Sequence, residues 1–296
     1  MGKSNKQHMT IHWKHIVQDD DSVPSVDATL KEKATLVGRI GQMMLSVGTG
    51  AWRVRNSMNT VAKVLGISCT ADIGLLSIEF TCYDENGSYT HSISLPTTGV
   101  NTHKLMELEH FMQGFPEHAA QYSVKQIHLL LDEIQKKPAN YKAWNLGLAS
   151  AIACCAFTFL LGGGPMEMIC AFFGAGVGNF VRKLMLQKKI SLLGNVAVSV
   201  AASCCVYVLT ILAAQHLFHV SEVHQAGYIC AMLFVIPGFP LITGGIDLAK
   251  LDLRSGLERI TYALLIILTA TMTGWVTALV FRFQPADFPD LQIDTP

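Results

Sequence analysis

The second half of the chain is a series of long apolar segments separated by short polar breaks. A helix that crosses a bilayer needs about 20 consecutive, mainly apolar residues. Five segments reach or approach this length, and the second of them is the shortest: residues 143–161, 166–181, 190–214, 225–245 and 261–281. The pattern therefore predicts a transmembrane domain of five helices over residues 143–281.

Residues 28–66 show the spacing of two amphipathic helices. Apolar side chains recur every three or four positions in two stretches, which Gly48 and Gly50 separate. Gly66 follows the second stretch and is suited to cap the C-terminus of a helix. We expect one helix on either side of the glycine pair.

The period then changes from helical spacing to alternation. Ile78, Phe80 and Cys82 alternate with polar or small residues, as in a strand with one buried face. The Asn86-Gly87 pair is typical of a tight hairpin turn, which we place at residues 85–88. Residues 89–95 are expected to form the partner strand.

Two more helices complete the first half of the chain. Asn101 is suited to cap a helix that ends near residue 114, and residues 123–137 have helical spacing. We therefore expect residues 28–137 to form a small α+β domain. The predicted fold class is that of an α-helical integral membrane protein in which this domain precedes the five spans. The remaining segments are a polar N-terminal tail expected to be disordered, a basic linker and an acidic C-terminal tail: residues 1–27, 138–142 and 282–296.

The charges support this division and exclude several classes of protein. Residues 1–142 hold 28 of the 44 charged side chains, whereas residues 143–281 hold only 12. A formal net charge of zero argues against nucleic-acid binding. The eight cysteines form no C-x-x-C pair, so neither a zinc site nor a redox motif is indicated. The polar N-terminus lacks the apolar core of a secretory signal peptide.

Basic residues predict the orientation in the membrane. With the N-terminus in the cytoplasm, the inner segments carry ten lysines and arginines, and the outer segments carry only Arg282. An odd number of spans then places the C-terminus, with its aspartates, outside. The inner basic residues are Lys136, Lys137, Lys142, Arg182, Lys183, Lys188, Lys189, Lys250, Arg254 and Arg259.

The fourth apolar segment contains a predicted break. Pro237 and Pro240 flank Gly238 near its middle, and proline removes a backbone donor from a helix. Such breaks in membrane helices are tolerated where they line a cavity or pack on protein, and transporters often bind substrate there. A half-helix starting at Pro240 could direct its amides at a carboxylate, with Thr243 one turn further on. The alternative is a kink that only shapes packing.

Glu167 and Asp247 are candidates for transport because ionisable groups in membrane segments are costly. Each also has a structural interpretation. Glu167 lies in the first turn of the second span, where an anion is favourable at a helix N-terminus. Asp247 lies at the inner end of the fourth span. Its role there could be purely structural, as the ion-pair partner of Lys250 or Arg254.

Polar residues elsewhere in the spans have weaker functional interpretations. Asn179 and Asn195 could bind substrate, but they could equally form hydrogen bonds between packed helices. His216, His219 and His224 could bind metal or sense pH in an outer loop, or could simply be solvated there. We expect no metal site and no cofactor.

The sequence from Pro237 to Arg259 resembles the threonine/serine exporter family. The family has a P-G-x-P-L motif in a membrane helix, an acidic residue and then a G-L-x-R element; the corresponding residues are Pro237, Gly238, Pro240, Leu241, Asp247, Gly256, Leu257 and Arg259. The likeness covers roughly residues 30–282. It is greatest to the two-component succinate exporter, in which a five-span subunit works with a small membrane partner.

This resemblance implies a function and a location. The chain would be one subunit of a secondary transporter in the bacterial inner membrane that exports succinate or another small carboxylate, or threonine and serine. The alternative is a membrane-anchored sensor whose cytoplasmic domain binds a metabolite. No catalytic constellation and no nucleotide-binding P-loop occurs in the sequence, so we expect neither an enzyme nor an ATP-driven pump.

Overall fold

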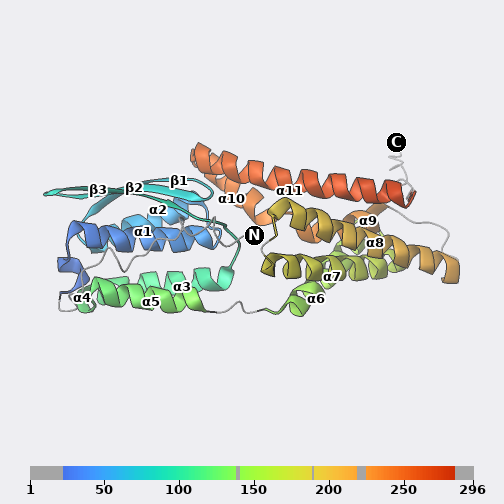
Figure 1. Cartoon of the computed structure of the whole chain (residues 1–296), viewed down its shortest axis with the longest axis horizontal. Helices are drawn as coiled ribbons and strands as arrows, with labels where there is room; N and C mark the ends of the chain where they lie inside the picture. Colours follow the sequence, from blue (N-terminus) through green and yellow to red (C-terminus); the bar gives the residue numbers. More distant parts are fainter. Residues whose placement is uncertain (1–22, 138–140, 189, 219–224, 284–296) are drawn as a thin grey trace, which may run out of the picture. The chain divides into compact units, whose positions relative to one another are not determined.

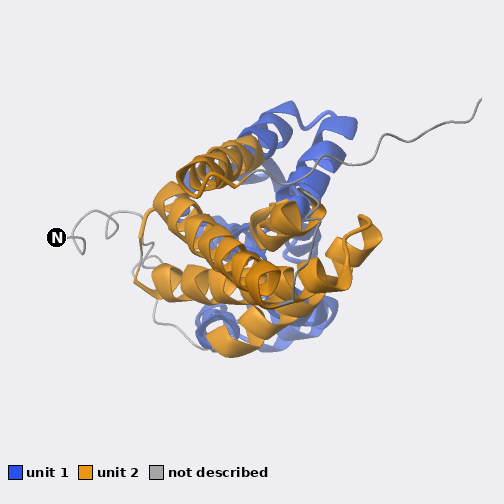
Figure 2. Ribbon diagram, turned by 90° about the vertical axis from the view of Figure 1, so that its right-hand side faces the viewer, with its two compact units in different colours: residues 1–138, 238–261 blue, residues 139–237, 262–296 orange. Residues whose placement is uncertain are grey.

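The computed structural model describes residues 23–137, 141–188, 190–218 and 225–283. The described chain is mostly helical, with one small sheet, and divides into two compact units (Figures 1 and 2). Unit 1 contains residues 1–138 and 238–261, and unit 2 contains residues 139–237 and 262–296. The greater part of the predicted tails, residues 138–140 of the linker, and His219 and His224 lie outside the described residues.

Unit 1 begins with the two predicted helices, α1 (Leu30–Ser46) and α2 (Ala51–Val64). A capping box between Thr29 and Glu32 starts α1. Gly66 follows α2 with φ of 70°, a left-handed conformation that glycine adopts without steric cost. The prediction of two helices and of the glycine cap is therefore confirmed.

The sheet of unit 1 has three antiparallel strands in the order β1 (Ser68–Ile73), β2 (Ser77–Asp84) and β3 (Gly87–Ser94). Helix α1 packs on β2 and β3. A Cβ atom at Gly38 of α1 would lie only 2.5 Å from the Phe80 ring, so glycine is what allows this close approach. The alternation predicted around Ile78 is confirmed.

The hairpin turn lies one residue earlier than predicted. Asp84 pairs with Gly87 in the β2–β3 ladder, which leaves Glu85 and Asn86 at the centre of the turn. The Asp84 carboxylate accepts hydrogen bonds from the amides of Asn86 and Gly87, at 2.8 and 3.0 Å. An Asx-type turn thus replaces the expected Asn-Gly turn. Strand β1 was not predicted, because half of its side chains are polar and only Ile73 is buried.

Three further helices close the N-terminal part of unit 1: α3 (Thr102–Gln113), α4 (Phe115–Gln121) and α5 (Val124–Lys136). The Asn101 side chain accepts a hydrogen bond from the Lys104 amide, which confirms its predicted role as a cap. The short helix α4 was not predicted.

A buried polar cluster joins α1 to α5. The Arg39 guanidinium forms an ion pair with Asp132 and donates a hydrogen bond to His128 Nδ1 at 3.0 Å. Because arginine can only donate, Nδ1 must be the acceptor, and Nε2–H then faces Thr35 Oγ1 at 3.0 Å. Burial and the neighbouring guanidinium lower the pKa of His128 to about 3.

We expect this histidine to make the protein less stable in mild acid. The unfolded chain binds a proton at His128 below about pH 6.5, whereas the folded chain does not until about pH 3. The free energy of unfolding should therefore be highest above pH 6.5 and fall by about 1.4 kcal/mol per pH unit towards pH 3. Thermal melting of the full chain in detergent at pH 7 and pH 5 measures the slope. A His128→Gln variant should lose this contribution; a variant with the wild-type slope would contradict the assignment.

Four uninterrupted helices are long and apolar enough to span a membrane: α6 (Ala143–Leu160), α7 (Pro165–Gln187), α8 (Leu192–Phe218) and α11 (Leu253–Val280). A bent pair, α9 (Gln225–Ala231) with α10 (Gly238–Ala249), meets the same test as one broken span or a re-entrant loop. Within the described residues, four spans, or five with the broken pair, are thus found by length and composition.

Four helix ends differ from the prediction by four residues or more. Helix α8 ends at Phe218, four residues late, so His216 lies in a helix and not in a loop, and α10 ends at Ala249, also four residues late. Helix α7 continues to Gln187, six residues beyond the predicted end, because the basic residues after Val181 remain helical. Helix α11 begins at Leu253, eight residues early, so Arg254 and Arg259 belong to a helix and not to a loop. The residues of α10 and the first residues of α11, up to Thr261, belong to unit 1.

Candidate functional site

The fourth apolar segment is broken in the structure between Ala231 and Gly238. A 3₁₀ turn, η4 (Leu233–Val235), follows α9, and its hydrogen bonds run from Val235 to Met232 and from Ile236 to Leu233. Pro237 then precedes the first residue of α10. The predicted break is confirmed, but the second half-helix begins at Gly238, two residues before the predicted start at Pro240.

Side chains from the neighbouring helices of unit 2 satisfy carbonyl groups that the break leaves without a helical donor. Ser203 of α8 donates to the Ala231 carbonyl at 2.6 Å. Arg182 of α7 donates from Nη1 to the Phe234 carbonyl at 2.9 Å. In an apolar environment an unpaired backbone group costs several kcal/mol, so these bonds stabilise the broken segment.

Arg182 is a residue that sequence reasoning missed as a site candidate, because it was counted only among the inner basic residues. The small residue Gly178, one turn before it, lets the Phe234 ring approach, since a Cβ there would lie 2.7 Å from the ring. Tyr262 of α11 lies within electrostatic range of the guanidinium. Among the described residues, no Asp or Glu forms an ion pair with Arg182.

Asn195 lies beside Arg182 at the start of α8. Its Nδ2 donates to the Arg182 carbonyl at 3.3 Å, and the side chain is only 1% exposed. Its Oδ1 atom is buried and has no hydrogen-bond partner in the described part of the chain. The structure thus places one predicted site residue, Asn195, next to an arginine that was not predicted.

The predicted residues of α10 differ in what they contact. The Thr243 hydroxyl donates to the Phe239 carbonyl of its own helix at 2.9 Å. Gly238 faces open space, because a Cβ there would have no atom within 4 Å. Pro240 is the third residue of the helix, where its missing N–H costs no helical hydrogen bond.

Asp247 holds together a buried network within unit 1. Both of its carboxylate oxygens lie 3.1 Å from the Ala51 amide, at the N-terminus of α2. Oδ2 also accepts from Ser255 at 2.8 Å and pairs with Arg259 Nε at 3.1 Å. Arg259 in turn donates to the Thr49 carbonyl at 2.7 Å. The carboxylate therefore caps α2, whose N-cap residue Gly50 has no side chain for this purpose.

Neither predicted partner of Asp247 is the observed one. Lys250 lies over the Trp52 ring at 3.9 Å, and Arg254 pairs with Asp72 of β1. Further bonds connect the α10–α11 hairpin to the α+β domain, namely the ion pair of Arg55 with Asp252 and the hydrogen bond from the Leu75 amide to Glu258.

Glu167 and Asn179 make the contacts that their structural interpretations predict. Glu167 is 2% exposed and accepts a hydrogen bond from the Gly164 amide at 2.9 Å, which caps α7. Asn179 donates to the Leu146 carbonyl and to the Ser150 hydroxyl, joining α7 to α6. These contacts account for the positions of the buried Glu167 and the half-buried Asn179 without a ligand.

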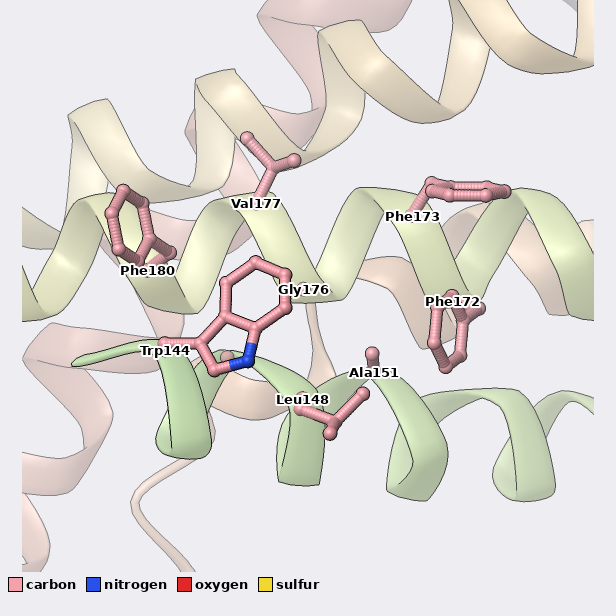
Figure 3. A pocket seen from close by; sticks show the side chains of 9 residues that line it. Trp144, Leu148, Ala151, Phe172, Phe173, Gly176, Val177 and Phe180 are labelled. Carbon is pink, nitrogen blue, oxygen red and sulfur yellow. The ribbon is translucent and has the colours of Figure 1, made fainter. Parts of the chain in front are cut away.

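A pocket of about 230 Å³ lies between α6 and α7 of unit 2 (Figure 3). Its lining is apolar apart from the Trp144 indole N–H, and no charged side chain reaches it. It therefore does not suit a carboxylate. Among the residues that the structure describes, no cluster of His, Cys, Asp or Glu could hold a metal ion.

The chain is similar to several known proteins. It is 25% identical over 240 residues to "Probable succinate transporter subunit YjjP" of Escherichia coli strain K12, covering 81% of this chain and 90% of that one. The Klebsiella aerogenes protein of the same name is also 25% identical, over 80% of this chain and 88% of its own. "Pheromone-regulated membrane protein 10" of Debaryomyces hansenii is 24% identical over 84% of this chain but 25% of its own length.

The comparison with solved structures finds no match. The family model described as "Putative threonine/serine exporter" matches residues 35–282, which include all three strands and both halves of the broken span. The chain therefore belongs to the threonine/serine exporter family of membrane transport proteins.

Proposed function

We propose that this chain is a subunit of a secondary transporter that exports small carboxylate metabolites by alternating access. The substrate is a dicarboxylate such as succinate, or threonine and serine. The α+β domain lies in the cytoplasm, the C-terminus lies outside, and the protein resides in the inner membrane of a bacterium. The ten-to-one distribution of basic residues supports this orientation.

The observation that carries the proposal is the broken fourth segment. Membrane anchoring needs only continuous helices, whereas this segment is interrupted at Pro237 and its freed carbonyls are bonded by Ser203 and Arg182. Irregular backbone at membrane depth is typical of substrate sites in transporters. Pro237, Gly238, Pro240 and Thr243 are the proposed lining of the substrate pathway, together with Glu167, Asn179, Asn195 and Asp247 as polar groups along it.

A second membrane protein is proposed as partner. The similar bacterial proteins are named as subunits, and each is matched over most of its length. A small chain with its own membrane helices would supply the other half of the transporter, giving a hetero-oligomer.

A membrane-anchored sensor remains the second candidate, because one observation favours it. The bonds from Asp247, Asp252, Arg254 and Glu258 connect the α10–α11 hairpin to the α+β domain. A ligand bound by that domain could act on the hairpin through these contacts.

Release of metabolites from cells lacking the chain tests the proposal. We expect less succinate or amino acid in the medium, restored by the wild-type chain and not by Gly238→Leu. Because a side chain at Gly238 meets open space, this variant should fold while it obstructs the break. Gly245→Leu is the matched control on the same helix, since it also meets open space.

Normal release with Gly238→Leu, at normal expression, would contradict a pathway at the break. Equal loss with both variants would also contradict it, since the effect would then not depend on the position of the break. Unchanged release of every tested acid from the deletion strain would favour the sensor.

A further inference from the structure

We infer that Arg182 binds a carboxylate group of the transported molecule at the break in the fourth segment; this inference rests on the proposed transport of carboxylates. The guanidinium carries five N–H donors in a planar arrangement. One donor is used by the Phe234 carbonyl. No carboxylate among the described residues compensates its charge.

The contrast with the two fully buried arginines among the described residues, Arg39 and Arg259, supports this assignment. Arg39 pairs with Asp132, and Arg259 pairs with Asp247. Buried cations are normally paired, because an isolated charge is costly away from water. Arg182 is partly buried in α7 and bonds only a neutral carbonyl. A bound anion that does not belong to the chain would neutralise the charge of the Arg182 guanidinium and accept hydrogen bonds from its remaining donors.

The neighbouring polar groups fit a carboxylate-bearing ligand. Asn195 bonds the backbone carbonyl of Arg182, and its buried Oδ1 is an acceptor without a described partner. This acceptor suits the hydroxyl or ammonium group of a hydroxy acid or an amino acid. The neutral phenol of Tyr262 lies near the guanidinium and does not compensate its charge. All three side chains belong to unit 2, together with the Phe234 carbonyl.

The charge of the ligand should therefore decide the affinity. Arginine binds carboxylates through paired hydrogen bonds, and hydrogen bonds to charged groups are about twice as strong as neutral ones. Succinate should bind more tightly than its neutral diamide, succinamide. A purely structural role for Arg182, as donor to the Phe234 carbonyl, gives no such preference.

The test measures equilibrium binding of succinate and succinamide to the full chain in lipid nanodiscs. We expect Arg182→Gln to weaken succinate binding about tenfold or more, to leave succinamide binding unchanged, and so to remove the preference. Arg182→Lys keeps the charge but not the planar donors, and should retain part of the preference. Lys183→Gln removes a neighbouring charge as the control and should behave as wild type.

A second measurement needs no variant. Succinate should slow the modification of Arg182 by phenylglyoxal, an arginine reagent, and should leave the half-exposed Arg53 unaffected. Lack of protection at Arg182, or a wild-type preference for succinate in Arg182→Gln, overturns the inference. If wild-type cells still export succinate through this chain in those cases, the proposed function stands. Absence of any release of acids by the wild-type chain overturns the proposed function instead.

Discussion

Replacing Asp247 with alanine is expected to destabilise unit 1 by about 3–5 kcal/mol. The carboxylate is fully buried, and its removal leaves the Arg259 guanidinium buried without its ion-pair partner. The Ala51 amide at the start of α2 loses its acceptor as well. The cost is large because removing one member of a buried pair exposes the full desolvation penalty of the other.

Thermal melting of the full chain in detergent measures this effect, and the expected decrease in Tm is roughly 5–15 °C. The double variant Asp247→Ala with Arg259→Met removes both charges and should recover much of the stability. Asp252→Ala is the matched control from the same hairpin. Its ion pair with Arg55 is partly exposed, so the cost should be about 1 kcal/mol or less.

Equal melting of Asp247→Ala and the wild type would contradict the network. A double variant that is less stable than Asp247→Ala alone would also contradict the network, because the two side chains would then contribute to stability independently.

The element types could largely be predicted from the sequence because they depend on local periodicity. The alternation around Phe80 reflects a strand with one buried face, and the apolar runs of the later helices reflect an apolar environment. The break at Pro237 was predictable for the same reason, since proline acts on its own turn. Strand β1 was missed because, as an exposed edge strand, it has little apolar periodicity.

The polar contacts of the candidate site could not be predicted, since they depend on tertiary packing. Arg182 bonds the Phe234 carbonyl across 52 positions, and Asp247 bonds the Ala51 amide across 196. No periodicity in the chain relates such positions. A family motif that includes Asp247 and Arg259 indicated that both matter, but not that they form an ion pair with each other.

The membrane potential provides the largest expected effect on transport. A negative charge that leaves a cell with a negative interior gains about 2.3 kcal/mol per 100 mV. Export of a succinate dianion without a coupled ion therefore gains about 4.6 kcal/mol at 100 mV, which corresponds to roughly a thousandfold concentration ratio or more at equilibrium. A zwitterionic amino acid gains nothing from the potential and requires a coupled proton.

Proteoliposomes that contain the chain and its co-purified partner, with potassium and valinomycin setting the potential, measure this effect. We expect the logarithm of the succinate concentration ratio, positive side over negative side, to rise in proportion to the imposed potential. Threonine or serine should accumulate only when a proton gradient, through its pH or its potential component, drives the coupled proton. Liposomes with Gly238→Leu are the negative control, because the obstructed break should abolish both responses. If the rate of transport of every tested acid is independent of both the potential and the pH gradient, the proposal that this chain is a secondary transporter is wrong. This holds whatever the affinity of Arg182 for a carboxylate.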